Sequence, residues 1–367
     1  MTDQSQPAAS ARRIAFFISP HGFGHAARSA SIMESLAAID PAFHFDIFTT
    51  VPDWFFRQCQ SFTFNYHHML TDIGLVQQTP FQADLAATVR ALEQFLPFDP
   101  AEVTARAEEL RRQDCQLVVC DIAPLGIRIA QEAGVPSVLI DNFTWDWLYQ
   151  GFSDKALNEF NLYLQSIFAD ATYHIQAQPV CQSGPAALSA APVSRKIKMP
   201  SHEVRSRLGL SDSRKVVLIT AGGVPKNYAF IDKLKRVTDI HFILPGTAET
   251  ETLQGNLILL PEYSAYFHPD LINAADAVVG KVGYSTIAEI YQAGVPFGYV
   301  ARPENREMQP LVDFIESHMH GMAITDAEFL SGRFTEYLEK LLRIPRTPGN
   351  RPNGADQVAG FIAALSK

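Results

Sequence analysis

The feature that most constrains the fold of this chain is a repeated alternation of short apolar runs with helical stretches. In the first half, buried strands are predicted at Arg13–Ile18, Phe43–Thr50, Asp114–Asp121 and Ser137–Ile140. Helices are predicted near Ala26–Ile39, Ala101–Arg112 and Ile127–Ala133. Strands that alternate with helices predict a parallel sheet with helices on both faces.

The same alternation returns after a segment rich in Pro, Ala and Ser, Gln178–Ser201. Further strands are predicted at Lys215–Thr220, His241–Leu244, Asn256–Leu260, Ala277–Gly280 and Pro296–Val300, with a closing helix at Asp356–Leu365. We interpret the segment as an interdomain linker, the alternative being a long surface loop within one domain. The predicted fold class is α/β, with Rossmann-like domains at residues 12–195 and 196–350 facing a central cleft. Residues 351–367 form a helix expected to pack back on the first domain.

Charge and composition exclude several classes of partner. The chain carries 39 acidic residues against 30 Lys and Arg, a net charge of −9, and the acidic excess lies in its first half. Phosphate backbones are bound by clusters of Lys and Arg, so no nucleic acid partner is expected. No apolar run approaches the length of a membrane span, and the polar amino terminus does not resemble a signal peptide. Four cysteines without C-x-x-C spacing favour a reduced, cytoplasmic compartment and predict no metal site.

The first segment whose residues suggest binding or catalysis is Ser19–Ser29, directly after the first predicted strand. Gly22 and Gly24 allow a tight turn into a helix whose free N–H groups suit an anion or a sugar hydroxyl. The third glycine of a dinucleotide-binding G-x-G-x-x-G pattern is absent. His25 is the candidate general base and His21 the second candidate, with a structural histidine as the alternative.

The second segment, Val278–Pro296, runs from a strand through a glycine turn into a helix. This arrangement predicts a phosphate site formed by backbone N–H groups together with Lys281, Gly283, Ser285 and Thr286. Glu289 is predicted to accept hydrogen bonds from a ribose diol, and the alternative is an acid that stabilises the helix dipole. No G-x-x-x-x-G-K-[ST] phosphate loop occurs in the chain.

A third glycine turn, in Thr220–Asn227, follows the strand Lys215–Thr220. Gly222 and Gly223 permit close backbone approach to a ligand, and Lys226 is within reach of phosphate oxygens. A Gly-Gly turn has little specificity by itself, so this segment supports the donor site only together with the second one.

Together the three segments resemble the GT-B glycosyltransferases. The shared patterns are H-G-F-G-H-A-x-R, N-F-x-W-D at Asn142–Asp146, and G-K-x-G-Y-x-T-x-x-E. The chain is similar to the N-acetylglucosaminyltransferases of peptidoglycan synthesis and, more strongly, to the amino-terminal region of plant-type L-arabinokinases. The resemblance implies that the second domain binds a nucleotide-sugar donor and the first an acceptor. It also implies an inverting transfer that needs no metal or cofactor.

The resemblance assigns roles to individual residues. It implies that His25 is the base, that Glu289 binds the donor ribose, and that Glu307 and Gln309, in the polar run Glu304–Gln309, meet the donor sugar. The residues expected at the acceptor are Gly22, Gly24, Arg28, Asn142 and Trp145, although Trp145 is equally open to ordinary core packing. The second glycine loop, G-G-V-P-K-N, departs from the family pattern G-G-S-x-G, and Lys281 stands where relatives have Arg or His.

The function expected from the sequence is therefore transfer of a sugar from a UDP-linked donor to an unknown acceptor hydroxyl. Two alternatives stay open, a sugar or nucleotide-sugar binding protein without catalysis, and a nucleotide-sugar epimerase or hydrolase on the same fold. The chain has no glycine- and serine-rich kinase phosphate loop, so sugar kinase activity is not expected.

Overall fold

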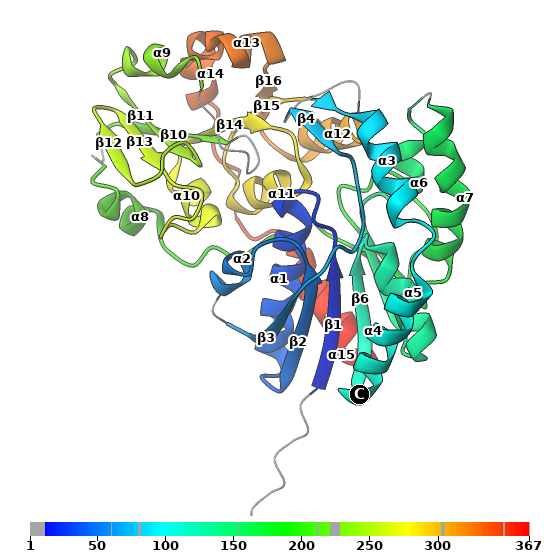
Figure 1. Cartoon of the computed structure of the whole chain (residues 1–367). Helices are drawn as coiled ribbons and strands as arrows, with labels where there is room; N and C mark the ends of the chain where they lie inside the picture. Colours follow the sequence, from blue (N-terminus) through cyan, green and yellow to red (C-terminus); the bar gives the residue numbers. More distant parts are fainter. Residues whose placement is uncertain are drawn as a thin grey trace, which may run out of the picture.

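The computed structural model describes residues 12–59, 61–79, 82–152, 154–210, 213–220, 228–301, 305–347 and 349–366. Two seven-stranded sheets dominate it, one built from the first half of the chain and one from the second (Figure 1). The predicted α/β class with two Rossmann-like sheets is confirmed.

The first sheet has the order β3-β2-β1-β6-β7-β8-β9, and its paired neighbours are parallel. Its strands are β1 (Arg12–Ile18), β2 (Phe43–Thr49), β3 (Thr63–His68), β6 (Cys115–Asp121), β7 (Ser137–Asp141), β8 (Tyr173–Ala177) and β9 (Leu188–Ala190). Chain order reverses direction between β1 and β6. Such a reversal is the switch point at which ligands bind in open α/β sheets.

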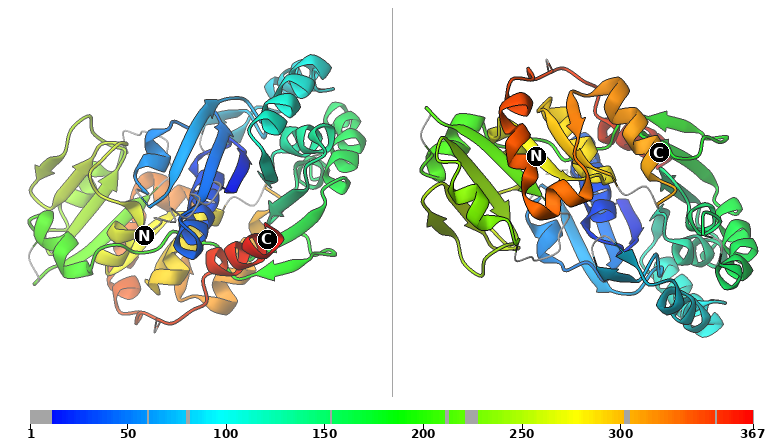
Figure 2. Two further views of the ribbon diagram at one scale, coloured as in Figure 1. Left: turned by 90° about the horizontal axis from the view of Figure 1, so that it is seen from below. Right: turned by 90° about the horizontal axis from the view of Figure 1, so that it is seen from above.

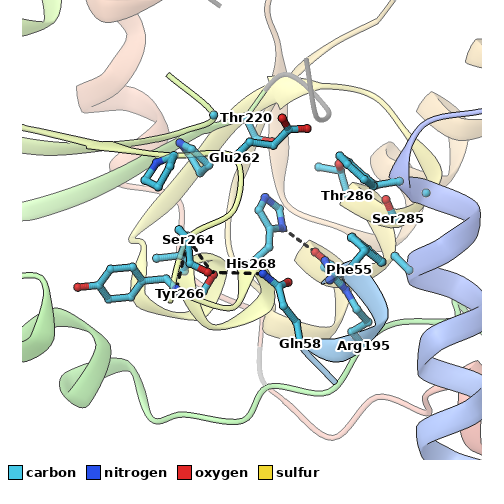
Figure 3. Close-up of a pocket in the computed structure, with 18 of the residues that line it drawn as sticks. Phe55, Gln58, Arg195, Thr220, Glu262, Ser264, Tyr266, His268, Ser285 and Thr286 are labelled. Carbon is cyan, nitrogen blue, oxygen red and sulfur yellow. Dashed lines mark hydrogen bonds and ion pairs between the residues drawn. The ribbon is translucent and has the colours of Figure 1, made fainter. Parts of the chain in front are cut away.

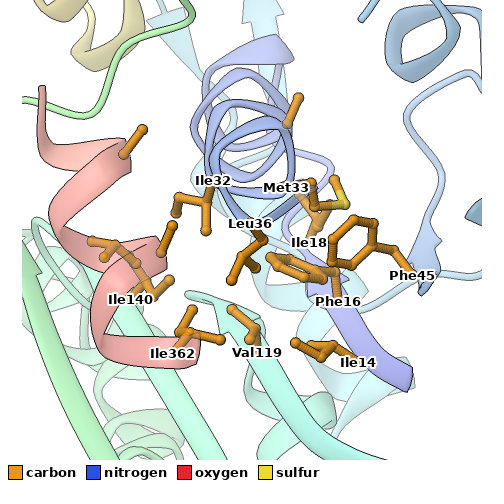
Figure 4. Close-up of a cluster of buried hydrophobic side chains, with 14 of the residues drawn as sticks. Ile14, Phe16, Ile18, Ile32, Met33, Leu36, Phe45, Val119, Ile140 and Ile362 are labelled. Atoms are coloured by element: carbon orange, nitrogen blue, oxygen red, sulfur yellow. The ribbon is translucent and has the colours of Figure 1, made fainter. Parts of the chain in front are cut away.

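Helices cover both faces of this sheet. They are α1 (Phe23–Ile39), α2 (Trp54–Arg57), α3 (Leu85–Phe95), α4 (Pro100–Arg112), α5 (Pro124–Ala133), α6 (Trp145–Tyr149) and α7 (Lys155–Ala169), with a small hairpin of β4 (Gln77–Thr79) and β5 (Gln82–Ala83). Phe16 of β1 faces the core under α1, shown in Figure 4, while Phe17 faces the core under α4, α5 and α7. Because both faces are buried, the strand is continuously apolar, which is why the sequence revealed it.

The second sheet has the order β12-β13-β11-β10-β14-β15-β16, with only β12 antiparallel among its paired strands. Its strands are β10 (Lys215–Thr220), β11 (Ile240–Pro245), β12 (Thr252–Gln254), β13 (Leu257–Leu260), β14 (Ala277–Lys281), β15 (Phe297–Val300) and β16 (Gly321–Ala323). Its helices are α8 (Ser201–Arg207), α9 (Ile231–Lys235), α10 (His268–Ala274), α11 (Tyr284–Ala293), α12 (Met308–His318), α13 (Asp326–Ser331), the 3-10 helix η1 (Arg333–Tyr337) and α14 (Leu338–Leu342). Here the order reverses between β10 and β14.

The last helix, α15 (Gly354–Leu365), lies against α1 of the first domain (Figures 1 and 2). Ile362 of α15 and Leu36 of α1 belong to one buried cluster (Figure 4), and the Ser35 hydroxyl donates to Oδ1 of Asp356 at 2.8 Å. The chain therefore crosses between the domains twice, once before α8 and once before α15.

Two predicted boundaries need correction. The predicted linker Gln178–Ser201 contains β9, which pairs with β8, so only residues 191–200 connect the first sheet to α8. A three-residue edge strand needs few apolar side chains, so its pattern was hidden among Pro, Ala and Ser. Helix α1 begins at Phe23, three residues before the prediction, because Gly22 at φ 73° makes the turn that precedes the helix.

Candidate active site

Two neighbouring cavities lie between the domains. The large cavity has a volume of about 640 Å³ and is lined mainly by the segments after β1, β3 and β7 together with the start of α11. The small cavity, of about 150 Å³, is lined by α2, the connection 191–200 and the second domain (Figure 3). Both cavities share the lining residues Phe23, Gly24, Ser285 and Thr286. The two cavities therefore adjoin at this point.

The shared wall is formed by the amino termini of α1 and α11, which contact each other across the domain boundary (Figure 1). Each helix follows the switch point of its own sheet. Their N-caps, Gly22 and Gly283, provide no side-chain hydrogen bond, and neither helix has an acidic residue in its first turn. A Cβ atom on Gly24 would lie 3.6 Å from Oγ of Ser285, so the two turns are close. Uncapped N–H groups and two positive dipole ends favour an anion here.

His25, the predicted base, lines the large cavity from the first turn of α1. Its Nδ1 lies 2.8 Å from Oδ1 of Asp121, which is fully buried at the end of β6. Ser29 donates to the other carboxylate oxygen at 3.1 Å. When Nδ1 donates to Asp121, Nε2 of His25 carries the lone pair, so the imidazole is arranged as a proton acceptor.

Arg28 lines the same cavity, but it is only 1% exposed and its guanidinium donates to other side chains. Nε donates to Oδ2 of Asp121 at 2.9 Å, and Nη1 donates to Oδ1 of Asn142 at 2.8 Å. Burial raises the pKa of Asp121, but the Arg28 charge and the hydrogen bonds outweigh it, so the pKa is lowered. Arg28 and Asn142 thus form a network that holds Asp121 in the wall of the large cavity, and their predicted contact with the acceptor stays a prediction.

The sequence did not single out Asp72, a second buried carboxyl group in the large cavity. Its Oδ1 accepts from Ser19 at 3.0 Å and its Oδ2 from the indole of Trp145 at 3.0 Å. Burial raises the pKa of Asp72 to about 7. Trp145 is 1% exposed, so most of its surface is packed in the core and little of it faces a ligand. The ring of His21 meets Trp145 edge-on, at 5.3 Å between centroids.

Glu289 lies in the small cavity with both carboxylate oxygens engaged. Oε1 accepts from Nε of Arg195 at 2.8 Å, and Oε2 lies 2.8 Å from Nδ1 of His268 (Figure 3). Burial raises the pKa of Glu289, but Arg195 and His268 outweigh it, and the pKa is lowered. The carboxylate is therefore ionised and fixed in the cavity wall. Sequence reasoning missed both partners, since an Arg in a connection and a His before Pro269 match no motif.

The other predicted donor residues are distributed unequally. Lys281, Gly283 and Glu307 line the large cavity, and Ser285 and Thr286 line both. Gln309 is an exception: it is exposed on α12, its amide donates to Asp313 at 2.7 Å, and it is absent from the described lining of both cavities. Its predicted contact with the donor sugar has no support, because α12 already begins at Met308 and turns the side chain along the helix. The predicted residues Gly222, Gly223 and Lys226 lie outside the described part of the chain, as does Glu304.

The described residues hold neither a metal-binding cluster nor a membrane-spanning helix. They contain no group of three or more His, Cys, Asp or Glu side chains arranged to hold a metal ion. Among the helices that the structure describes, none has the length and apolar character needed to cross a bilayer.

Comparison with known proteins agrees with the fold and the predicted resemblance. Residues 242–361 match the glycosyltransferase family 28 C-terminal domain. L-arabinokinase of Arabidopsis thaliana is 28% identical over 356 residues, covering 95% of this chain and 34% of that protein, so the chain spans about a third of its length. The UDP-N-acetylglucosamine–N-acetylmuramyl-(pentapeptide) pyrophosphoryl-undecaprenol N-acetylglucosamine transferase of Bacillus licheniformis is 27% identical over 192 residues, 47% of this chain and 49% of that protein.

Among solved structures, the glycosyltransferase VinC in complex with dTDP superposes with a TM-score of 0.62 at 14% identity, covering 96% of this chain and 99% of that one. At this identity the likeness concerns the fold alone. The predicted resemblance to GT-B glycosyltransferases is confirmed. Residues 242–361 are thus similar to the glycosyltransferase family 28 C-terminal domain, in a chain that has the GT-B fold.

Proposed function

We propose that this protein transfers a sugar from a nucleotide-sugar donor, UDP-linked, to an acceptor hydroxyl, with inversion and without a metal ion or other cofactor. The observation that carries the proposal is the meeting of the two cavities at the starts of α1 and α11. His25, held by Asp121, stands on one side of this point, and Glu289 stands in the small cavity on the other.

In the proposed reaction the acceptor occupies the large cavity. Nε2 of His25 takes the proton of the acceptor hydroxyl as its oxygen attacks the anomeric carbon of the donor sugar. The bond between that carbon and the phosphate oxygen breaks, and the nucleoside diphosphate leaves with the electron pair. Asp121 stabilises the imidazolium that forms, because the two groups are already hydrogen-bonded in a buried site.

The donor is proposed to lie along the start of α11. The free N–H groups after Gly283, the hydroxyls of Ser285 and Thr286, and Lys281 would stabilise the charge that develops on the diphosphate. Glu289 would accept hydrogen bonds from the ribose, since an oxygen that already has one partner retains a second lone pair. The VinC structure contains dTDP, so thymidine nucleotides are a necessary comparison for the uridine series.

Nucleotide binding is the first test, because it needs no knowledge of the acceptor. Calorimetric titration of the full chain with UDP, dTDP and GDP should give saturable binding for one of them, weakened by Glu289→Gln. His25→Ala should leave that affinity unchanged, because His25 serves the acceptor side. Release of the nucleoside diphosphate from its sugar conjugate, measured with a panel of hydroxylated acceptors, should then fall at least a hundredfold in His25→Ala.

The outcomes separate the alternatives. Absence of binding by every nucleotide would refute the donor site. Turnover of the nucleotide-sugar without an acceptor would indicate a hydrolase or epimerase. Binding without turnover across the acceptor panel would favour a sugar or nucleotide-sugar binding protein.

A further inference from the structure

The first domain contributes an aromatic wall to the small cavity. This wall comes from α2, a single helical turn that lies against the second domain (Figure 1). Trp54 and Phe55 line the same cavity as Glu289. The Gln58 amide donates to the carbonyl oxygen of Ser264 at 3.5 Å (Figure 3). A ligand held by the second domain in this cavity therefore meets side chains of the first.

Phe55 is already covered. Its ring is stacked on Phe23, with 5.0 Å between centroids and 3° between planes, and the Arg195 guanidinium lies 5.0 Å from its centroid. Only 5% of Phe55 is exposed. Phe55 thus anchors α2 and has little surface left for a ligand.

Trp54 differs from Phe55 in this respect. It is half-buried, and its contacts with Phe23, Phe55 and Tyr263 are tilted or edge-on, at 59°, 61° and 53° between planes. No stacked ring covers its indole among the described residues. The contact with Tyr263, at 5.1 Å between centroids, crosses the domain boundary, and Tyr263 is 63% exposed.

The small cavity is smaller than a typical ligand site. About 150 Å³ is less than the roughly 300–1,000 Å³ typical of small-molecule sites. A nucleotide bound beside Glu289 would therefore have to displace part of the wall. The anchored Phe55 and the paired Arg195 resist displacement, whereas Trp54 is only half-buried and one of its three ring contacts is with the exposed Tyr263.

On the basis of the proposed donor site, we propose that Trp54 of the acceptor domain is a nucleotide-binding residue whose indole face stacks on the base of the donor. Bound nucleotide replaces the contact between Trp54 and Tyr263. The first domain then recognises the donor directly, through an aromatic face that accepts any base, while the second domain supplies the hydrogen bonds that discriminate between bases.

The test uses the full chain with UDP and dTDP as probes. Of its three tryptophans, Trp145 and Trp147 are 1% and 6% exposed, so Trp54 should dominate any change in tryptophan fluorescence on binding. That change should disappear in Trp54→Phe and persist in the control Trp147→Phe. By calorimetry, Trp54→Ala should bind roughly ten- to hundredfold more weakly, the size of a lost stack on a base. Trp54→Phe, which keeps a ring, should stay within about threefold of wild type.

The variant Tyr263→Ala distinguishes stacking of Trp54 on the base from a role of Trp54 only in the contact between the domains. It should bind the nucleotide at least as tightly as wild type, because wild type must break this contact on binding and the variant has already lost it. Equal weakening by Tyr263→Ala and Trp54→Ala, or no weakening by Trp54→Ala, would overturn the proposal. Should Trp54→Ala fail to fold in thermal unfolding, an unchanged fluorescence signal in Trp54→Phe would overturn it instead. Failure of wild type to bind any nucleotide would refute the donor site itself, which is a different result.

Discussion

The ion pair between Arg195 and Glu289 allows a quantitative prediction. The two side chains are 6% and 2% exposed, and their 2.8 Å contact joins the connection 191–200 to α11. Arg195→Met keeps an apolar stem beside Phe55 but leaves the carboxylate buried without its cation. Breaking a buried pair from one side costs about 3–5 kcal/mol. We expect about 3 kcal/mol, since His268 still faces Glu289, and a fall in Tm of about 6–12 °C for a domain of this size.

Two further measurements test whether the broken ion pair causes the loss of stability in Arg195→Met. Replacing both partners, Arg195→Met with Glu289→Met, should cost less than the sum of the single changes, with a coupling energy on the order of 0.5–3 kcal/mol. The pH dependence has a defined sign because the pKa of Glu289 is lowered in the folded protein. A lowered carboxyl pKa stabilises the protein above its ordinary value of 4.5 and loses that effect at lower pH. The difference between wild type and Arg195→Met should therefore be largest near neutral pH and shrink towards pH 4.

The matched control is the pair Arg207–Glu203, with the same residue types at 2.7 Å but 56% and 45% exposed. Arg207→Met should cost less than about 1 kcal/mol, because solvent screens exposed ion pairs. Urea and thermal unfolding followed by circular dichroism measure all the variants. The reasoning is refuted if Arg195→Met costs no more than Arg207→Met, or if the single changes add without coupling.

Three other predictions concern stability. The pKa of Asp72 is about 7 against an ordinary 3.8, so the folded state retains a proton that the unfolded state has lost between these values. This group should lower the free energy of unfolding by about 4 kcal/mol as pH rises from 4 to 8, and Asp72→Asn should lose that slope in unfolding experiments across pH. Arg28→Met leaves the buried carboxylate of Asp121, at the end of β6, without its cation. The change should lower the free energy of unfolding by about 3–5 kcal/mol in urea, and a loss below about 1 kcal/mol would contradict this. In Gly280→Ala the new Cβ would clash with the carbonyl oxygen of Thr220, so we expect a loss of about 1–3 kcal/mol of stability and a lower Tm in thermal unfolding. Gly283→Ala, with open space and extended backbone, should unfold like wild type.

Local sequence was sufficient for the central strands of both sheets and for the glycine turns that begin α1 and α11, but it did not predict β3, β8, β9, β12 or β16 towards the sheet edges. A strand buried on both faces must be apolar throughout, and a turn with positive φ selects glycine, as at Gly22. Both signals are confined to a few consecutive residues, so they can be read without the rest of the chain. The same reasoning identified His25, in the first turn of α1, and Glu289, which lies in the second turn of α11, as polar side chains close to such switch points.

The partners of these residues were decided only by the tertiary structure. His25 and Asp121 are 96 residues apart in the chain, and Arg195 and Glu289 are 94 apart. A carboxylate becomes a suitable partner for a histidine or an arginine only when folding brings the two together and removes water around them. Residue type and spacing carry no record of this. The sequence therefore indicated which side chains are candidates for chemistry, whereas packing determined which of them are held, buried and ionised.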